Sequence, residues 1–566
     1  MAKGVPAAPM RPEIPYSRLI LSWTSLTDEV INHNYPGAGT SEDPYRVEWL
    51  ENDPRNPLSL PFGRKWLITF IMAFATLAIT FSSSGFSGAN PQIMHDFDVS
   101  EEVAVVGVSL FVLAFAIGPA IWGPLSELCG RQIIFVITYV GVTLFSGVAI
   151  ASKNITSVLV LRFFSGAFGA SALTNAAGVI ADMFTARERG LASVVFISAP
   201  FIGPTLGPIA GSFLGAAQGW KWLEGLITIL TGISLILGVL LVPETYAPFL
   251  LQKRAAKLSK LHGAVYKSKL EIENGHKTTT QIFNTAMIRP WILLFREPIV
   301  LLLSLYMAII YGTMYLEFAA FPIVFGEVRG WSQGVTGLSF IGVMIGQLLG
   351  MVYAVLDNGR YTKIVDRSPG KRAPAEARLG PSMVGAFALP IGLFWFAWTN
   401  YPNIHWIVSI IGTIPFGFSH VVVFLSVANY LIDSYTVYAA SVLAANATIR
   451  ALFGAAFPLF TTPMYHNLGI HWASSIPAFM AVLCMPFPFL FWKYGPRIRA
   501  ACKYSADATR ILEEMIAKST KPAEEVQKEE PAIVNDNKGS FASSLQEPAQ
   551  KEGNGDGVDL ESGSSP

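Results

Sequence analysis

A chain of 566 residues that is 52% hydrophobic and only 14% charged is too apolar to consist of ordinary soluble domains. Its formal net charge of +1 excludes a strong overall electrostatic field that would attract nucleic acid or an acidic partner. The cysteines Cys129, Cys484 and Cys502 lie far apart and lack metal-ligand spacing, which argues against a disulfide framework and a zinc site. We therefore expect most of the chain to lie in a lipid bilayer.

We count twelve apolar runs of about 20 residues, the length that a helix needs to cross a bilayer. They begin near Trp66, Val103, Gln132, Ser157, Gly190, Trp222, Ile299, Val335, Pro381, Ile404, Val437 and Ala473. Only helices or closed barrels span lipid, and these runs lack the alternation of barrel strands. The sequence thus predicts an all-α integral membrane protein with twelve transmembrane helices.

The positions of basic residues predict the orientation of these helices. Lys and Arg are concentrated in the segment 244–298, between the sixth and seventh runs, and again from Arg360 to Arg378, after the eighth run. Because cytoplasmic loops are enriched in Lys and Arg, both segments should be cytoplasmic. With an even number of spans, both termini are then cytoplasmic as well. The polar first stretch lacks the features of a cleavable signal peptide.

The long basic segment divides the runs six and six, and an internal repeat accompanies this division. AFGAS at 167–171 corresponds to PFGFS at 415–419, and ASV at 192–194 recurs at 440–442, with 248 positions between the members of each pair. Agreement at one offset in two separate helices suggests homologous halves. Such halves pack about an axis along the membrane normal and enclose a site near the midplane.

The sequence therefore predicts five parts. They are a largely disordered cytoplasmic tail at 1–62, two pseudo-symmetric six-helix bundles at 63–243 and 299–500, a basic cytoplasmic loop at 244–298, and a disordered cytoplasmic tail at 501–566. Within the first tail, the stretch 43–57 is rich enough in aromatic residues and prolines to dock against the membrane domain.

The connection between the second and third runs reads GPLSELCGRQ, beginning at Gly123. Gly123 and Gly130 permit a tight reversal, and Glu127 and Arg131 lie beside each other at a helix end. The spacing resembles the G-x-L-x-D-x-x-G-R signature of the major facilitator superfamily, although Glu127 stands where that family usually has Asp. The resemblance implies a charge relay of Glu127 and Arg131 with Asp182, which latches the halves in the outward-open state. A generic cytoplasmic turn is the alternative.

The fifth run contains GPTLGPIAG, in which glycines and prolines recur every four positions. They are Gly203, Pro204, Gly207, Pro208 and Gly211. One helix face is therefore smooth enough for close backbone contact, and the prolines bend the helix. The pattern resembles the G-P-x-x-G-P-x-x-G element of antiporters in the same superfamily, which implies export. A kinked packing helix with no bearing on direction is the alternative.

Two charged residues stand out within the apolar runs, Arg162 in the fourth and Glu317 in the seventh. A charge in hydrocarbon persists only when it is paired or faces water. At about 1.5 Å per residue they lie about 7 and about 12 Å below the outer surface, which allows them to meet. Arg162 also matches part of a superfamily element implicated in proton coupling. We hypothesise that protonation of Glu317 competes with its pairing to Arg162 or to a cationic substrate; a structural carboxylate with another partner is the alternative.

Seven further residues within the runs are candidates for a substrate cavity, with helix packing as the alternative role of each. They are Asn175, Tyr311, Tyr315, Gln347, His420, Asn446 and Arg450.

Several longer strings resemble the fungal 12-spanner drug:proton antiporter branch of the superfamily. They are NYLIDSY at 429–435, AASVLAAN at 439–446, GAAFPLF at 454–460 and PETYAP at 243–248. The resemblance implies a monomeric secondary transporter that exports small amphipathic molecules, such as drugs, toxins or secondary metabolites, across the fungal plasma membrane. Protons are its expected counter-substrate. We expect no cofactor, because the proton gradient supplies the energy for transport.

Other functions stay open at this point. No nucleophile elbow, phosphate loop or metal cluster occurs in the sequence, so it offers no site for an enzyme or an ATP-driven pump. A proton-coupled carrier of a polar metabolite, such as a sugar, an organic acid or a polyamine, is one alternative. A non-transporting receptor on the same fold is another. NIT at Asn154 fits a glycosylation acceptor, but it lies too near the bilayer for us to expect modification.

Overall fold

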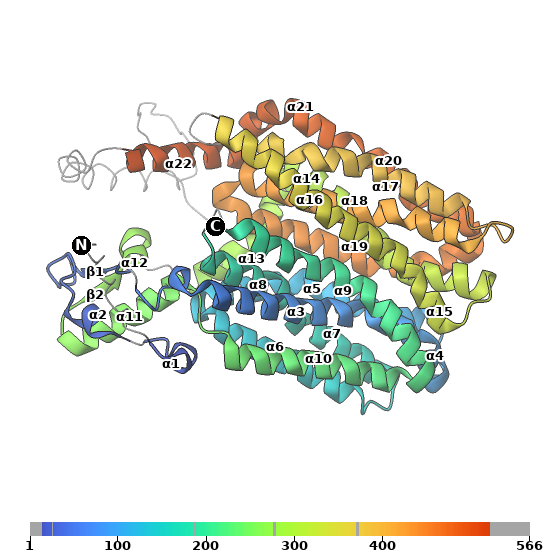
Figure 1. The fold of residues 1–566 in the computed structure, drawn as a ribbon, viewed down its shortest axis with the longest axis horizontal. Coiled ribbons are helices and arrows are strands. Elements are labelled where there is room, and N and C mark those ends of the chain that lie inside the picture. The colour runs from blue at the N-terminus through green and yellow to red at the C-terminus, as the bar shows by residue number, and fades with distance from the viewer. Residues whose placement is uncertain are drawn as a thin grey trace, which may run out of the picture. The chain divides into compact units, whose positions relative to one another are not determined.

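The computed structural model describes residues 14–24, 26–51, 53–185, 188–275, 279–368 and 373–520, which are mostly helical (Figure 1). Within these ranges, twelve helical segments are long and apolar enough to cross a membrane. The segment furthest from its predicted start begins at Ala375 instead of Pro381. The prediction of an all-α membrane protein with twelve spans is therefore confirmed.

The spans of the first half lie in consecutive helices. They are α3 (Phe62–Gly85), η2 (Phe86–Ala89), α4 (Asn90–Phe97), α5 (Glu101–Cys129), α6 (Arg131–Ala149), α7 (Ile155–Gly169), α8 (Ser171–Met183), α9 (Arg189–Gln218) and α10 (Trp220–Leu241). The second half is built in the same way. Its helices are α14 (Pro298–Phe321), η3 (Pro322–Val328), α15 (Gln333–Gly337), η4 (Leu338–Phe340), α16 (Ile341–Arg367), η6 (Ala375–Leu379), α17 (Gly380–Trp398), α18 (Trp406–Ser434), η7 (Thr436–Tyr438), α19 (Ala439–Leu468), α20 (Ile470–Cys484) and α21 (Pro486–Ala501).

Glycines with positive φ join successive antiparallel spans. Gly130 (φ 94°) connects α5 to α6, Gly219 (φ 85°) connects α9 to α10, and Gly469 (φ 75°) connects α19 to α20. Residues with a Cβ rarely adopt this conformation, whereas glycine does so at little cost. Gly219 and Gly469 follow the fifth and eleventh spans, so the two halves reverse the chain at corresponding places.

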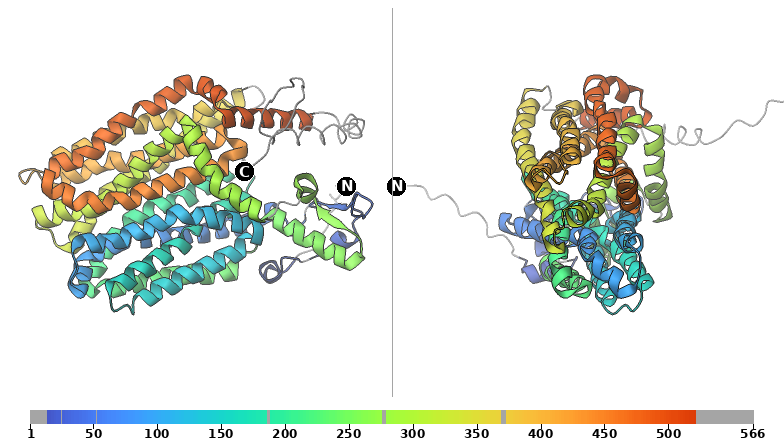
Figure 2. Two further views of the ribbon diagram at one scale, coloured as in Figure 1. Left: turned by 180° about the vertical axis from the view of Figure 1, so that it is seen from behind. Right: turned by 90° about the vertical axis from the view of Figure 1, so that its right-hand side faces the viewer.

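The two halves repeat the same packing. In the first half α3 lies along α9, and in the second half α14 lies along α19, which pairs the first span with the fifth and the seventh with the eleventh. The halves then meet where α5 packs on α19 and where α9 packs on α15 and α16. Figure 2 shows the two sets of helices side by side. The predicted division into two six-helix bundles describes this arrangement.

The glycines Gly203, Gly207 and Gly211 of α9 face α3 at backbone distance. A Cβ placed on Gly203 would lie 2.0 Å from the hydroxyl of Thr80, and one on Gly211 would lie 2.3 Å from the carbonyl oxygen of Gly85. The predicted smooth face therefore exists, and it is filled by the first span. Close approach of this kind is how small residues drive helix association in lipid.

The described residues before α3 pack against the segment that joins the halves. Strand β1 (Tyr45–Val47) pairs in parallel with β2 (Tyr266–Ser268), and Asp53 forms a 2.5 Å ion pair with Arg254. Both of these charged side chains are almost fully buried. The prediction of a largely disordered first tail is therefore wrong for the described residues, because a buried ion pair and a small apolar cluster hold them. The cluster contains Tyr35, Val47, Ala255 and Leu258.

The remaining elements lie outside the spans. They are α1 (Tyr16–Leu21), α2 (Asp28–Asn32), η1 (Pro57–Ser59), α11 (Ala247–His262), α12 (Lys269–Asn274), α13 (Thr279–Arg296) and α22 (Lys503–Thr520). Helix α22 corrects the prediction of disorder for the first part of the second tail, while residues 521–566 lie outside the described residues. We call the segment 244–298, which joins the two halves, the linker. The end of the bundles next to α11 is the linker end, and the end formed by α4 and α15 is the far end (Figure 1).

The contact between α3 and α9 predicts the effect of two glycine substitutions. A Cβ on Gly207 would lie 2.1 Å from the Ser84 hydroxyl and 2.7 Å from the Gly85 amide nitrogen, so Gly207→Ala must push the helices apart. We expect it to lower the free energy of unfolding by about 1–3 kcal/mol. The measurement is the thermal midpoint of the purified protein in detergent.

The matched control is Gly225→Ala in α10, where a Cβ would meet no atom within 4 Å. Since alanine also favours the helix by up to about 1 kcal/mol, this variant should be as stable as the parent or slightly more so. Equal midpoints for the two variants would contradict the close contact.

Candidate functional site

Hydrogen bonds join the two halves at the far end. The amides of Gln92 in α4 and Gln333 in α15 bond reciprocally, at 2.8 and 2.9 Å. The Gln333 amide also donates to the carbonyl oxygen of Gly88 at 2.6 Å. Nearby, the Thr462 hydroxyl donates to the carboxylate of Glu101 at 3.3 Å. The far end is therefore bridged by polar contacts between the halves.

Three more side-chain hydrogen bonds cross between the halves away from this end. The hydroxyls of Ser83 and Tyr315 lie 2.8 Å apart, and the Thr205 hydroxyl donates to the Gln347 carbonyl at 2.9 Å. The Thr448 hydroxyl donates at 3.2 Å to a backbone carbonyl of α5. Tyr315 and Gln347, both predicted cavity candidates, thus lie at the interface.

At the linker end, the structure brings together Arg131 and Asp182. The Arg131 Nε lies 3.3 Å from the Asp182 carboxylate, and its Nη1 donates to Ser126 at 2.6 Å. Glu127 is exposed and forms no ion pair with any described residue. The resulting contacts lie within the first half and the start of the linker. The turn at Gly130 places Arg131 at the first position of α6.

Glu244 completes this cluster, although the sequence reasoning gave it no role. Its carboxylate accepts hydrogen bonds from the backbone amides of Arg131 and Gln132 at 3.0 Å each, so it caps the N-terminus of α6. Negative charge is stabilised at that end of a helix. The guanidinium of Arg131 lies 4.7 Å over the Tyr246 ring. Burial, assisted by the charge of Glu127, raises the pKa of Tyr246 to about 12, so this ring stays neutral. The sequence offered one signal for this role, a glutamate that follows closely on the end of the sixth span.

Arg162 lies inside the first half and pairs with Glu224 in α10. The Nη1 to Oε1 distance is 2.7 Å, and both side chains are almost fully buried. Its other nitrogens donate to the carbonyl oxygens of Ser82 and Gly107 at 3.0 and 2.9 Å, and Phe86 stacks on the guanidinium at 4.0 Å. The predicted meeting of Arg162 with the seventh span is therefore wrong in this structure. Glu224, near the start of the sixth run, is the partner that the sequence reasoning missed.

Glu317 lies in α14 and is buried, with 4% of its surface exposed. Its Oε2 has no hydrogen-bond partner among the described residues. At about 100° per residue, Glu317 projects from a different side of α14 than Tyr311 and Tyr315, which lie one turn apart. It is therefore a buried carboxyl inside the second half and not part of the interface formed by these tyrosines.

A polar and aromatic cluster occupies the interface between the halves. The Arg450 guanidinium lies 4.9 Å over the Tyr311 ring and 4.7 Å over the Phe424 ring. His420 packs edge-on against Phe201 of the first half, with 4.9 Å between the ring centroids. Phe201 and Phe424 are members that the sequence reasoning missed, because aromatic residues are common in every span.

The other two cavity candidates lie within helix packing. The Asn175 amide donates at 2.9 Å to the backbone carbonyl of Arg131, inside the first half. The Asn446 amide contacts the Ser304 hydroxyl and the Met307 sulfur, both at 3.2 Å, between α19 and α14. Both side chains are buried, which matches the packing alternative for these residues.

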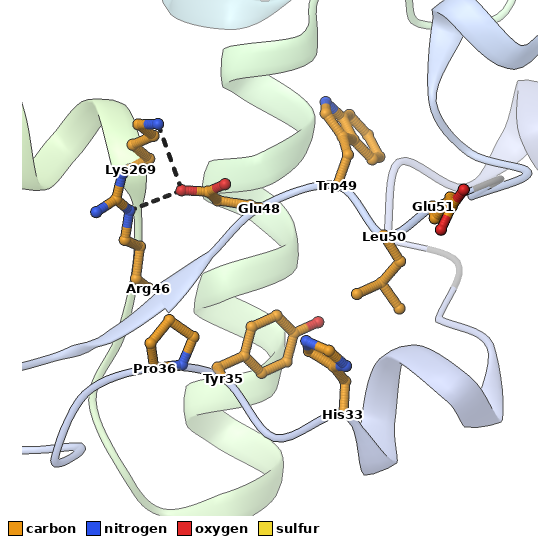
Figure 3. A pocket seen from close by; sticks show the side chains of 9 residues that line it. All are labelled: His33, Tyr35, Pro36, Arg46, Glu48, Trp49, Leu50, Glu51 and Lys269. Carbon is orange, nitrogen blue, oxygen red and sulfur yellow. Dashed lines mark ion pairs between the residues drawn. The ribbon is translucent and has the colours of Figure 1, made fainter. Parts of the chain in front are cut away.

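A separate open pocket of about 560 Å³ lies outside the spans, between the N-terminal segment and the linker (Figure 3). Its central carboxylate, Glu48, already pairs with Arg46 at 2.7 Å and with Lys269 at 3.6 Å. The charges of this pocket therefore neutralise one another. Among the described residues, no group of His, Cys, Asp and Glu side chains is placed to hold a metal ion.

Two six-helix halves of matching topology, which meet around a polar and aromatic interface, define the class of two-bundle membrane carriers. A profile of the Major Facilitator Superfamily matches residues 72–458. The chain belongs to this superfamily of transporters, as its motifs suggested.

Two curated relatives from fungi cover most of the chain. The "MFS-type efflux pump MFS2" of Trichophyton rubrum is 56% identical over 504 residues, which are 89% of this chain and 84% of the relative. The "Major facilitator superfamily multidrug transporter mdrA" of Aspergillus fumigatus is 54% identical over 518 residues, which are 92% and 85% of the two chains. A solved structure of the proton:xylose symporter XylE shares the fold, with a TM-score of 0.54, 19% identity, and coverage of 76% of this chain and 96% of XylE.

The burial of the Arg162 and Glu224 pair predicts an unequal response to single and double substitution. Glu224→Leu should lower the free energy of unfolding by about 3–5 kcal/mol, because it leaves the Arg162 charge buried without a counter-ion. Adding Arg162→Met should recover most of that loss. The measurement is the thermal midpoint of each purified variant in detergent.

Arg378→Met serves as the control, since the pair of Arg378 with Asp433 is partly exposed and contributes about 1 kcal/mol or less. A Glu224→Leu variant as stable as the parent, or a double variant as unstable as the single one, would show that Glu224 does not neutralise Arg162 in the folded protein.

Proposed function

We propose that the protein exports small amphipathic molecules, such as drugs or secondary metabolites, in exchange for protons and by alternating access. The observation that carries this proposal is the interface cluster of Tyr311, His420 and Arg450, which both halves enclose and the far end covers. Broad aromatic surfaces with a few polar groups are typical of sites that accept varied apolar ligands. The relatives named as an efflux pump and a multidrug transporter support the same direction.

The orientation follows from the distribution of positive charge. The linker between the halves contains most of the basic residues found between spans, so we place the linker end and both termini in the cytoplasm. The far end, closed by Gln92 and Gln333, then faces outward. In this assignment the structure corresponds to an inward-facing conformation, and we place the protein in the plasma membrane as a monomer.

The α9 stripe from Gly203 to Gly211 supports alternating access on physical grounds, and its resemblance to the antiporter element supports export. It locks α9 onto α3 through backbone contacts, while the opposite side of α9 meets α15, where a Cβ on Gly337 would lie 3.0 Å from the Pro208 carbonyl oxygen. A rigid α3 and α9 pair can therefore rock as one unit against the second half.

Glu317 is the group that we assign to proton coupling. An ionised carboxylate without a counter-ion is costly at this depth, whereas a protonated carboxyl is much less so. Because Arg162 is satisfied by Glu224 and two backbone carbonyls, we assign Arg162 a bracing role. Arg162 would then affect proton coupling only indirectly, because it keeps the helices of the first half packed together.

Export is tested in a yeast host stripped of its own exporters. The protein should lower the retention of labelled amphipathic dyes, and a protonophore should abolish this effect. Glu317→Gln should reduce proton-driven export to background but leave substrate exchange across the membrane intact, because the neutral side chain resembles the protonated one.

Glu327→Gln is the matched control, since Glu327 is exposed at the far end and should not affect export. Higher retention in cells that contain the protein would indicate an uptake symporter, and no change would indicate a receptor. Full proton-driven export by Glu317→Gln would refute its role in coupling.

Alternating access is tested by cross-linking the two halves at the far end. In a Cys129→Ser background, Gln92→Cys and Gln333→Cys place thiols where the two amides meet at 2.8 Å. A short bifunctional methanethiosulfonate reagent should join them and reduce export to background, and dithiothreitol should restore it. Each single cysteine variant is the control. Undiminished export after complete cross-linking would show that the far end need not open.

A further inference from the structure

Arg450 differs from the other arginines buried within the spans. It lies twelve residues into α19, is only partly exposed, and takes no ion pair or hydrogen bond with any described residue. Arg162, which is also buried within the spans, instead bonds one carboxylate and two backbone carbonyls. The described carboxylates of the second half that pair with arginines, Asp357, Glu376 and Asp433, lie toward the linker end. Arg450 therefore presents a positive charge with its donors unused.

The surroundings of Arg450 are aromatic and come from both halves. Tyr311 and Phe424 stack on the guanidinium, and Phe201 from the first half packs on Phe424 with 5.1 Å between the centroids. Aromatic faces attract a cation, but they accept none of its five N–H bonds in the plane of the guanidinium. The rings thus hold the group in place and leave its edge available.

A second polar group near Arg450 is also without a partner. His420 is 4% exposed, and its Nδ1 has no hydrogen-bond partner among the described residues. Its ring lies 6.4 Å from Tyr311, the same tyrosine on which Arg450 stacks. A buried polar atom without a partner is rare in proteins, and a ligand is one of the groups that satisfy it.

No carboxylate on the neighbouring helices is placed to neutralise Arg450. Glu317 projects from another side of α14 than Tyr311. Asp433, near the end of α18, is held by Arg378 at 2.9 Å. The part of α5 near Thr448 contributes a backbone carbonyl, which the Thr448 hydroxyl already uses. The described residues thus leave the counter-ion to be supplied by a ligand.

We propose that Arg450 is the specificity-determining residue for organic anions, and that the preferred substrates have a carboxylate on an aromatic or other apolar body. The carboxylate would accept the paired N–H bonds of the guanidinium, whose planar geometry matches it. The apolar body would lie among Phe201, Phe424 and Tyr311, and His420 would contact the polar end. This inference rests on the proposed export function, whose site it specifies.

The test compares three probes that share a naphthylmethyl body and differ in the charge of a small polar group. They are 1-naphthylacetate, 1-naphthylacetamide and 2-(1-naphthyl)ethylammonium, and their equilibrium binding to the full chain in lipid nanodiscs is measured by competition with a labelled probe. The wild type should bind the anion at least about tenfold more tightly than the amide, and the cation most weakly, as expected for a charge-assisted pair.

Arg450→Gln should remove this preference by weakening the anion about tenfold or more, while binding of the amide stays within about twofold. Arg450→Lys keeps the charge but not the planar fork, so it should retain part of the preference. Lys221→Gln removes an exposed positive charge at the start of α10 and should change none of the three affinities. The wild-type comparison needs no variant and stands even if Arg450→Gln does not fold.

An anion that binds no more tightly than the amide, or a preference that survives Arg450→Gln, would overturn the inference. Proton-driven export of the amide and the cation without preference for the anion would overturn it as well, and would leave the export function intact. Preferential binding of the anion without any proton-driven export would instead refute the export function alone.

Discussion

Arg162 and Glu224 meet at 2.7 Å in the interior of the first half, where a lone charge would cost about 2.5–3.5 kcal/mol or more. Two backbone carbonyls and a phenylalanine ring complete the surroundings of Arg162, so one side chain ties α7 to α3, α5 and α10. Among the described residues, the second half has no ion pair at comparable depth. Its buried glutamate and arginine within the spans, Glu317 and Arg450, form no ion pair with any residue that the structure describes. The first half is therefore held rigid by its buried ion pair, whereas Glu317 and Arg450 of the second half are available to bind a proton or a ligand.

The sequence predicted the architecture well because lipid restricts it strongly. Long apolar runs, the basic linker and the repeated strings identified twelve spans and two halves, since only hydrogen-bonded helices fit a bilayer. The contact of α9 with α3 was also predicted as a smooth face, although the sequence did not reveal its partner helix. The pairing of buried charges was not predictable. Arg162 had several carboxylates within reach by depth alone, and the choice of Glu224 depends on which helices become neighbours.

The N-terminal segment shows a second limit of sequence reasoning. Its polar, proline-rich composition resembles that of disordered tails, yet Asp53 and Arg254 form a buried ion pair across about two hundred positions. Arg55 follows closely and donates at 3.2 Å to the backbone carbonyl of Glu244, whose carboxylate caps α6. The segment is thus attached to the same helix end that presents Arg131 to Asp182. The composition of a segment does not show whether a residue far away in the sequence, such as Arg254, will pair with it in the fold.

The contacts between the halves differ in kind from those within each half. Among the ion pairs of the described residues, none crosses between the halves; each lies within one half, within the linker and N-terminal segment, or within α22. The side-chain bonds that do cross, such as those of Gln92 with Gln333 and of Thr205 with Gln347, join mostly neutral groups. Each contributes only about 0.5–1.5 kcal/mol, whereas separating a buried ion pair costs several times more. The interface can therefore exchange its bonds for water or for a ligand at modest cost, while the contacts within each half are kept. A carrier that alternates between two openings needs this division of strong contacts within its halves and weak contacts between them.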